Sequence, residues 1–260
     1  MKTKFSFLDG NLHEEIIKIL TDLLQLNQKE LKDIYDEIKS YDKIRSSESS
    51  PHWGKPLLPT FLSSKLKNFS DGNGLGIDLP IWFNWDDKPN RLMIIGIDPL
   101  RKHNDNRLIL GSPFGLATKG GRETQRNKYW NFVEPLLVDN SVYIMDVYKL
   151  FVKDSDLKKE IRNQKVFFYE ILKRELDVVK PNKIITLGKA AASSINNLFK
   201  KTHDLNSSIE VINLPHLSPV VLQGLTVTAR MYQSLGQLKG DEEMIMLGKS
   251  IENKNESLFD

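Results

Sequence analysis

The 260-residue chain contains no cysteine. This absence excludes disulfide bonds, thiolate nucleophiles, cysteine-ligated zinc and iron–sulfur clusters. The five histidines show no HExxH motif or comparable ligand spacing, so we expect no metal site. No apolar run reaches the roughly 18–20 residues of a membrane span. The first ten residues also lack the basic-then-apolar layout of a signal peptide. We therefore expect a soluble cytoplasmic protein with no membrane partner.

The formal net charge is only +3, but the charges are unevenly distributed. Residues 91–201 carry 21 basic and 12 acidic side chains, a net charge of +9, between two mildly acidic flanks. A local excess of this kind is typical of phosphate-binding surfaces. The alternative is a set of solvated helix faces, since Lys165, Lys173 and Arg174 lie in a segment predicted to be helical.

The first 90 residues divide into two parts. Apolar residues recur at helical spacing over 16–24 and again over 31–41, which predicts a helical hairpin. A polar segment, Ser46–Pro51, then breaks the pattern, and the residues up to Pro89 look irregular. We therefore expect an N-terminal helical extension over 1–45 and an irregular linker or lid segment over 46–90.

From Arg91 onward, short apolar segments alternate with stretches of helical periodicity. Four segments have the composition of strands buried in a parallel sheet: Leu92–Ile97, Val142–Met145, Lys183–Leu187 and Ile209–Leu214. Helices are expected near Arg126–Leu137, Asn163–Val179 and Lys189–Lys200, with a further one after Gly224. This alternation predicts an α/β domain over 91–260, a three-layer α/β/α fold with a central four-stranded parallel sheet.

Polar and glycine residues stand at the predicted strand ends, where ligand sites lie in sheets of this kind. These residues are Asp98, Asp146, Gly188 and His216. An Asp and a His from separate strand ends can act together on a substrate in the crevice between them. A strand-terminal Asp is also a common helix cap, so the residues alone leave both interpretations open. The GxSxG, P-loop and dinucleotide-binding fingerprints are all absent.

Five short motifs follow one another in an order that resembles the uracil-DNA glycosylase superfamily. Gly96-Ile97-Asp98-Pro99 is similar to its Gly-x-Asp-Pro turn. Gly111–Ala117 resembles its Gly-x-Pro-Phe segment, and Val142–Lys149 resembles its strand that ends in a base-reading residue. Ile184–Ala191 resembles its Leu-Gly-x-x-Ala turn, and His216–Pro219 resembles its His-Pro-Ser-Pro loop. Each motif is short, so the resemblance depends on their order over Arg91–Gln223.

The resemblance implies an enzyme that hydrolyses the N-glycosidic bond of a base flipped out of single- or double-stranded DNA. It assigns water activation to Asp98 and stabilisation of the departing base to His216. Phe114 would stack on the base, and the base pocket would also include Gly96, Ile97, Leu100 and Asp146. DNA contacts would come from Ser112, Gly188, Lys189, Leu217, Ser218, Pro219, Val220 and Val221. Because the chain lacks cysteine, the iron–sulfur branches of the family do not apply and no cofactor is expected.

Two positions depart from the pattern of the uracil-specific enzymes. Leu100 stands where those enzymes have a Tyr that blocks 5-substituted bases, and Asp146 replaces the usual Asn. An ionised Asp only accepts hydrogen bonds, whereas Asn both donates and accepts. The sequence therefore predicts a modified or amino-bearing base as a better substrate than uracil.

Two other functions remain open at this level. One is a non-catalytic DNA-binding relative that recognises lesions or modified DNA. The other is a hydrolase of free nucleosides or nucleotides, because the same bond chemistry needs no duplex. The two residues Phe114 and His216 also have interpretations without a catalytic role. Phe114 can be a core residue, and His216 can be an ordinary loop histidine.

Overall fold

The computed structural model describes residues 4–43, 55–56, 66, 75–99, 108–125, 127–201 and 209–217. Its central sheet has five strands in the order β3-β6-β4-β8-β9. Their bounds are Ile81–Phe83, Asn140–Asp146, Asn90–Gly96, Lys183–Leu187 and Glu210–Leu214, respectively. The last four strands are parallel, which confirms the predicted parallel sheet, and β3 pairs antiparallel with β6 as an added edge strand.

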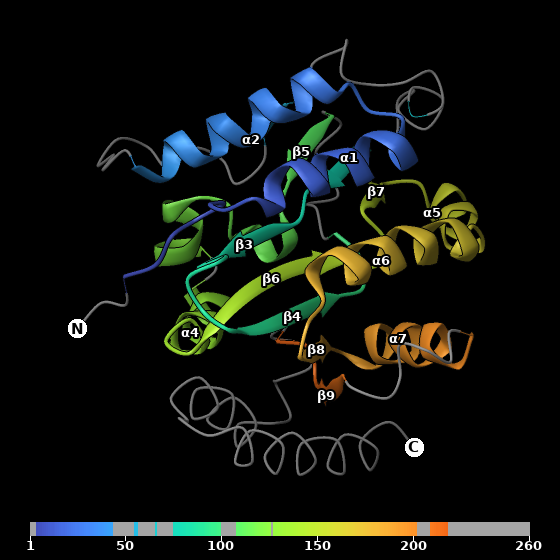
Figure 1. The fold of residues 1–260 in the computed structure, drawn as a ribbon. Helices are drawn as coiled ribbons and strands as arrows, with labels where there is room; N and C mark the ends of the chain where they lie inside the picture. The colour runs from blue at the N-terminus through green and yellow to red at the C-terminus, as the bar shows by residue number, and fades with distance from the viewer. Residues whose placement is uncertain are drawn as a thin grey trace.

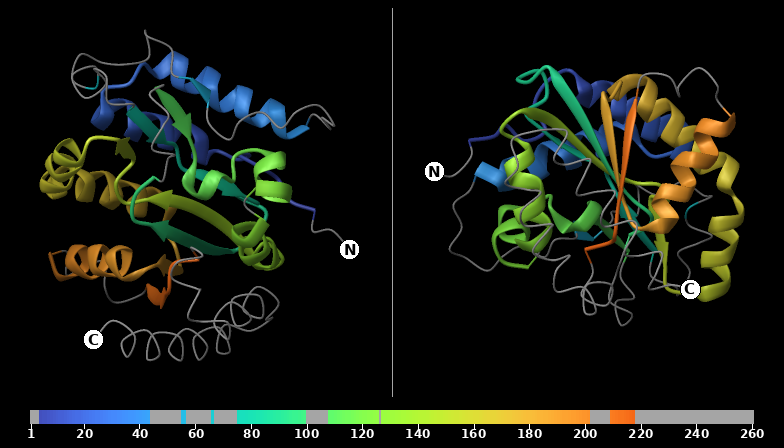
Figure 2. Two further views of the ribbon diagram at one scale, coloured as in Figure 1. Left: turned by 180° about the vertical axis from the view of Figure 1, so that it is seen from behind. Right: turned by 90° about the horizontal axis from the view of Figure 1, so that it is seen from below.

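Helices cover both faces of this sheet. The helices α4 (Asn127–Leu136), α5 (Ser155–Asn163), α6 (Lys165–Val179) and α7 (Lys189–Lys201) connect its parallel strands. The β4-to-β6 crossover runs in one direction across the sheet, and the crossovers to β8 and β9 run in the other. Right-handed connections therefore place α4 on one face and α6 and α7 on the opposite face, as Figure 2 shows. The predicted three-layer α/β/α fold is confirmed.

The predicted N-terminal helical hairpin is also confirmed. It consists of α1 (Leu12–Leu24) and α2 (Gln28–Lys43), and α1 packs along α6 (Figure 1). The apolar stripe of α1 is buried there, with Ile16 and Leu20 fully inaccessible to solvent. Within the described ranges, no helix combines the length and the apolar composition that a bilayer span requires.

A second sheet has the order β1-β5-β2-β7. Its strands are Lys55–Pro56, Ile109–Gly111, Leu75–Asp78 and Leu150–Val152, respectively. The prediction of an irregular segment over 46–90 is therefore wrong where β1, β2 and β3 lie. These strands have two to four residues, which is too short for a period-two pattern to be recognised in the sequence. Because β2 pairs with both β5 and β7, this sheet holds together the loop after β5 and the turn after β6.

Candidate active site

The carboxyl ends of β4 and β6 lie side by side and carry the first and the third of the predicted motifs. Gly96 is the register partner of Asp146. Beyond the strands, the amides of Val147 and Tyr148 donate to the carbonyl oxygens of Gly96 and Ile97, both at 2.9 Å. This continued pairing brings the two motifs to one edge of the sheet, as the parallel strands predict.

Gly96, Asp146 and Phe114 converge on one point at this edge. A Cβ atom at Gly96 would lie 2.2 Å from Oδ1 of Asp146 and 3.0 Å from Cζ of Phe114. Any larger residue at position 96 would therefore require the Asp146 carboxylate to shift from this position. Asp146 is buried at 3% exposure, while Phe114 is half-buried. The structure thus brings together three of the residues predicted to bind a base.

Phe114 lies in a tight turn, the 3-10 helix Pro113–Gly115, directly after β5. Its φ of 56° is in the left-handed region, which is unfavourable for a bulky side chain, and strained residues of this kind cluster at active sites and ligand clamps. Ser112 holds the turn, because its Oγ accepts a hydrogen bond of 2.9 Å from the amide of Ala117. Ser112 is buried at 1% exposure, so its hydroxyl supports the Phe114 turn, and a contact from it to DNA stays a prediction.

His216 follows β9 and lies against the same aromatic ring. Its centroid is 6.3 Å from that of Phe114 and 6.2 Å from that of Tyr129. Tyr129, on α4, stacks on Phe114 with centroids 4.9 Å apart and planes at 14°. Sequence reasoning missed Tyr129 because a tyrosine on an amphipathic helix carries no signal that distinguishes it from the core. We call Phe114, Tyr129 and His216 the aromatic cluster.

Gly188 makes the close approach of the β9 loop possible. It has a φ of 97°, and a Cβ there would lie 3.3 Å from Cβ of His216. Its amide donates to the carbonyl of Leu214 at 2.7 Å. Gly188 therefore has a structural role in this loop, because its amide is already engaged. Lys189, the first residue of α7, is exposed, and Leu217 is buried. Four predicted DNA contacts (Ser218, Pro219, Val220 and Val221) and the base-pocket residue Leu100 lie outside the described residues.

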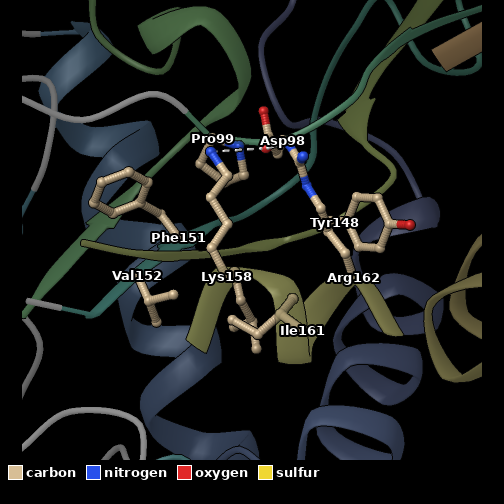
Figure 3. A pocket seen from close by; sticks show the side chains of 9 residues that line it. Asp98, Pro99, Tyr148, Phe151, Val152, Lys158, Ile161 and Arg162 are labelled. Atoms are coloured by element: carbon tan, nitrogen blue, oxygen red, sulfur yellow. Dashed lines mark hydrogen bonds and ion pairs between the residues drawn. The ribbon is translucent and has the colours of Figure 1, made fainter. Parts of the chain in front are cut away.

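The carboxylate of Asp98 contacts two basic side chains of α5. Its Oδ2 lies 2.8 Å from a guanidinium nitrogen of Arg162 and 3.2 Å from Nζ of Lys158 (Figure 3). Asp98 and these two cations line a pocket together with Tyr148, Phe151 and four other residues; the lining includes neither Asp146 nor any member of the aromatic cluster. The basic partners of Asp98 were not predicted, because nothing in the sequence indicates that α5 faces the end of β4.

A buried network lies behind the Asp146 turn. Lys149 and Glu175 are both fully buried and form an ion pair of 2.9 Å. Nζ of Lys149 also donates to the carbonyl of Asp146 at 3.2 Å, and the hydroxyl of Tyr143 donates to Glu175 at 2.6 Å. Burial, and secondarily the charge of Glu175, raises the pKa of Tyr143 well above its usual value. The network therefore ties the backbone that carries Asp146 to α6.

The Phe114 turn is tied to the N-terminal segment by a second buried group, Arg122. Its guanidinium donates to the carbonyl of Leu116 at 2.8 Å and pairs with Asp42 of α2. Four aromatic rings surround it at 5.1–5.7 Å, those of Phe5, Phe7, Phe83 and Trp130. Burial lowers the pKa of Arg122, and the charge of Asp42 opposes this shift. Arg122 thus links the backbone just after the Phe114 turn to the N-terminal residues of the chain.

Comparison with known protein families matches residues 83–235 to the Uracil DNA glycosylase superfamily. This range contains all five motifs and more than half of the chain. No curated protein matches the chain. Within the part of the chain that the structure describes, no group of three or more potential ligands is placed to hold a metal ion. The family match and the order of the strand-end residues agree, and the chain belongs to the uracil DNA glycosylase superfamily.

Proposed function

We propose that this protein is a DNA glycosylase that removes a damaged or modified base in DNA repair. The observation that carries the proposal is the convergence of Gly96, Phe114 and Asp146 beside His216, within a chain of this superfamily. A flat aromatic ring, a buried hydrogen-bonding group and an imidazole are the groups that hold a flipped base and polarise it. In this proposal, residues 91–260 form the glycosylase-like domain, with 1–45 as a helical extension and 46–90 as the connecting segment.

The proposed reaction is hydrolysis of the bond between the sugar C1′ and the base nitrogen. Water adds its oxygen to C1′ while the C1′–N bond breaks, and the bonding electrons leave with the base. Positive charge develops on the sugar, where the carboxylate of Asp98 stabilises it and orients the water. Negative charge develops on the base, which receives a hydrogen bond from His216. The water loses one proton as its oxygen bonds to C1′, and the base nitrogen gains one, so the step balances. The products are a free base and an abasic sugar.

Asp146 is proposed to select the base. Its carboxylate is buried beside the Phe114 ring, so a base stacked on Phe114 would present its edge to this group. An ionised carboxylate accepts from an exocyclic amine but repels the carbonyl oxygens of uracil. Mismatches of this kind are worth about 1–3 kcal/mol, or roughly 5- to 150-fold in rate. We therefore expect an amino-bearing or otherwise modified base to be released faster than uracil.

The test is base release from a panel of oligonucleotides that contain uracil, hypoxanthine, xanthine or a 5-modified pyrimidine, scored as abasic sites. The wild type should release at least one base, and Asp98→Asn and His216→Gln should lose that activity. Asp156→Asn is the matched control, because Asp156 is an exposed carboxylate on α5 away from the aromatic cluster. Excision of uracil at ordinary enzyme rates, unchanged in Asp146→Ala, would contradict the proposed selectivity.

A DNA-binding relative without catalysis is the second candidate function. The observation that favours it is the pair of cations on Asp98, which engage the proposed catalytic carboxylate. Under this alternative, the wild type binds the oligonucleotides and releases no base from any of them. The panel therefore separates the two functions directly.

A further inference from the structure

Two basic side chains on α5 meet the same carboxylate oxygen at the edge of the site. Lys158 and Arg162 are four residues apart, so they lie on one face of the helix. Both reach Oδ2 of Asp98, as Figure 3 shows. The side chains of Lys158 and Arg162 remain 39% and 49% exposed, whereas that of Asp98 is 18% exposed. The cations are therefore open to solvent while their partner lies deeper in the pocket.

This arrangement suits an anion from outside. A guanidinium and an ammonium that converge on one oxygen form the donor set that binds phosphate oxygens, with Arg supplying a planar fork and Lys a point charge. Ion pairs with exposed cations add little to stability, so an incoming phosphate can replace the carboxylate at low cost. The same pocket edge carries Asp98, the residue that must reach the sugar of the target nucleotide in the proposed function.

We propose that Lys158 and Arg162 form a binding site for a backbone phosphate of the DNA strand, and that Asp98 occupies this site in the free protein. The inference depends on the proposed function for the identity of the strand. When the phosphate binds, it takes over both cations and releases the Asp98 carboxylate for the target nucleotide. DNA binding and the availability of Asp98 are then coupled. This contact differs from the DNA contacts expected at the Phe114 turn, at Lys189 and in the loop after His216.

The first test measures binding without base release. A labelled single-stranded oligonucleotide with only ordinary bases is titrated with the full chain at several salt concentrations. For single strands, each phosphate contact adds about −0.7 to the slope of the logarithm of the binding constant against the logarithm of the salt concentration. One contact therefore strengthens binding about fivefold at 0.1 M salt relative to 1 M salt. Lys158→Gln and Arg162→Gln should each weaken binding by up to this factor, because both cations hold the same phosphate. Lys159→Gln is the matched control, because Lys159 is on the same helix but is 76% exposed and pairs with Asp156.

The second test uses the competing carboxylate. Asp98→Asn frees both cations, so it should tighten oligonucleotide binding several-fold, and Arg162→Gln in the same chain should abolish the gain. Asp156→Asn removes an equal charge from α5 and should tighten binding less than twofold. An equal gain in Asp98→Asn and Asp156→Asn, or a gain that persists without Arg162, would overturn the proposal. Thermal unfolding of each variant confirms that it folds.

The outcomes separate this inference from the proposed function. If the wild type binds no oligonucleotide, the proposed function fails. If it binds and Lys158→Gln and Arg162→Gln behave like Lys159→Gln, only the α5 site fails. Sodium phosphate should displace the oligonucleotide no more than sodium chloride of the same ionic strength. Stronger displacement that disappears in Arg162→Gln would assign the site to a free phosphate and overturn its assignment to DNA.

Discussion

Gly96→Ala is the substitution that most directly perturbs the geometry of the site. The added Cβ would lie 2.2 Å from Oδ1 of Asp146, more than 1 Å inside the roughly 3.5 Å at which atoms are in contact. It would also lie 3.0 Å from Cζ of Phe114, so the Asp146 carboxylate must move aside in a direction that the Phe114 ring does not occupy. Gly96 does not have a positive φ, so the expected cost comes from contact and not from backbone strain.

Overpacking of this kind costs about 1–3 kcal/mol of stability. For a chain of this size, that corresponds to a fall of roughly 2–12 °C in Tm. A displacement of Asp146 by about 1 Å should also lower base release by on the order of 100-fold. Differential scanning fluorimetry measures the first effect, and the oligonucleotide panel measures the second.

The control for this prediction is the same substitution in an Asp146→Ala chain. Removing the carboxylate removes the closest contact, so Gly96→Ala should cost less there, with a coupling of about 0.5–3 kcal/mol between the two positions. A Gly96→Ala protein with unchanged Tm and unchanged base release would refute the placement of Asp146 over Gly96. Equal costs in both backgrounds would refute the contact as the cause.

Three further predictions concern ionisable groups within the fold: the pair Lys149 and Glu175, Arg122, and the partly buried His13 on α1. Lys149→Met leaves Glu175 as an uncompensated buried charge, so it should lower the free energy of unfolding in urea by about 3–5 kcal/mol. Lys149→Met combined with Glu175→Gln should recover most of this loss, and equal losses in the two proteins would contradict the ion pair. Arg122→Met should cost about 3 kcal/mol, because it leaves Asp42 and a buried carbonyl without their donor; a change below 1 kcal/mol would be inconsistent with the described packing. Burial lowers the pKa of His13 below 6.5, so the unfolded chain binds more protons, and stability should fall as the pH drops from above 6.5 through the folded-state pKa. The free energy of unfolding of His13→Gln should therefore fall less between pH 7.5 and pH 5.5 than that of the wild type. An equal fall in both proteins would show that other groups cause the pH dependence.

The long elements of this fold can be predicted from the sequence because each has a pattern that needs no partner. The central residues of β4 and β6, Leu92–Ile95 and Val142–Met145, are apolar, and α6 and α7 follow with helical periodicity. The sequence therefore predicts both the order of these elements and their layers. The small second sheet has no such pattern. Its strand β2 has four residues, and the strands that pair with it, β5 and β7, lie far away in the sequence.

The candidate site divides in the same way. Parallel strands bring their carboxyl ends together, so the neighbourhood of Gly96 and Asp146 follows from topology. The topology of the sheet does not determine which side chains from the helices lie near these strand ends. Tyr129 comes from α4 on one face of the sheet, and Lys158 and Arg162 come from α5, so their positions depend on helix packing.

The most direct test of the account compares base release by the wild type and by Asp146→Asn on the same panel of oligonucleotides. An amide both donates and accepts, so the substitution should shift the preference toward uracil by roughly 5- to 150-fold relative to an amino-bearing base. The account predicts release of at least one base by the wild type and this shift in the variant. No base release from the whole panel, or the same preference in both proteins, would contradict it.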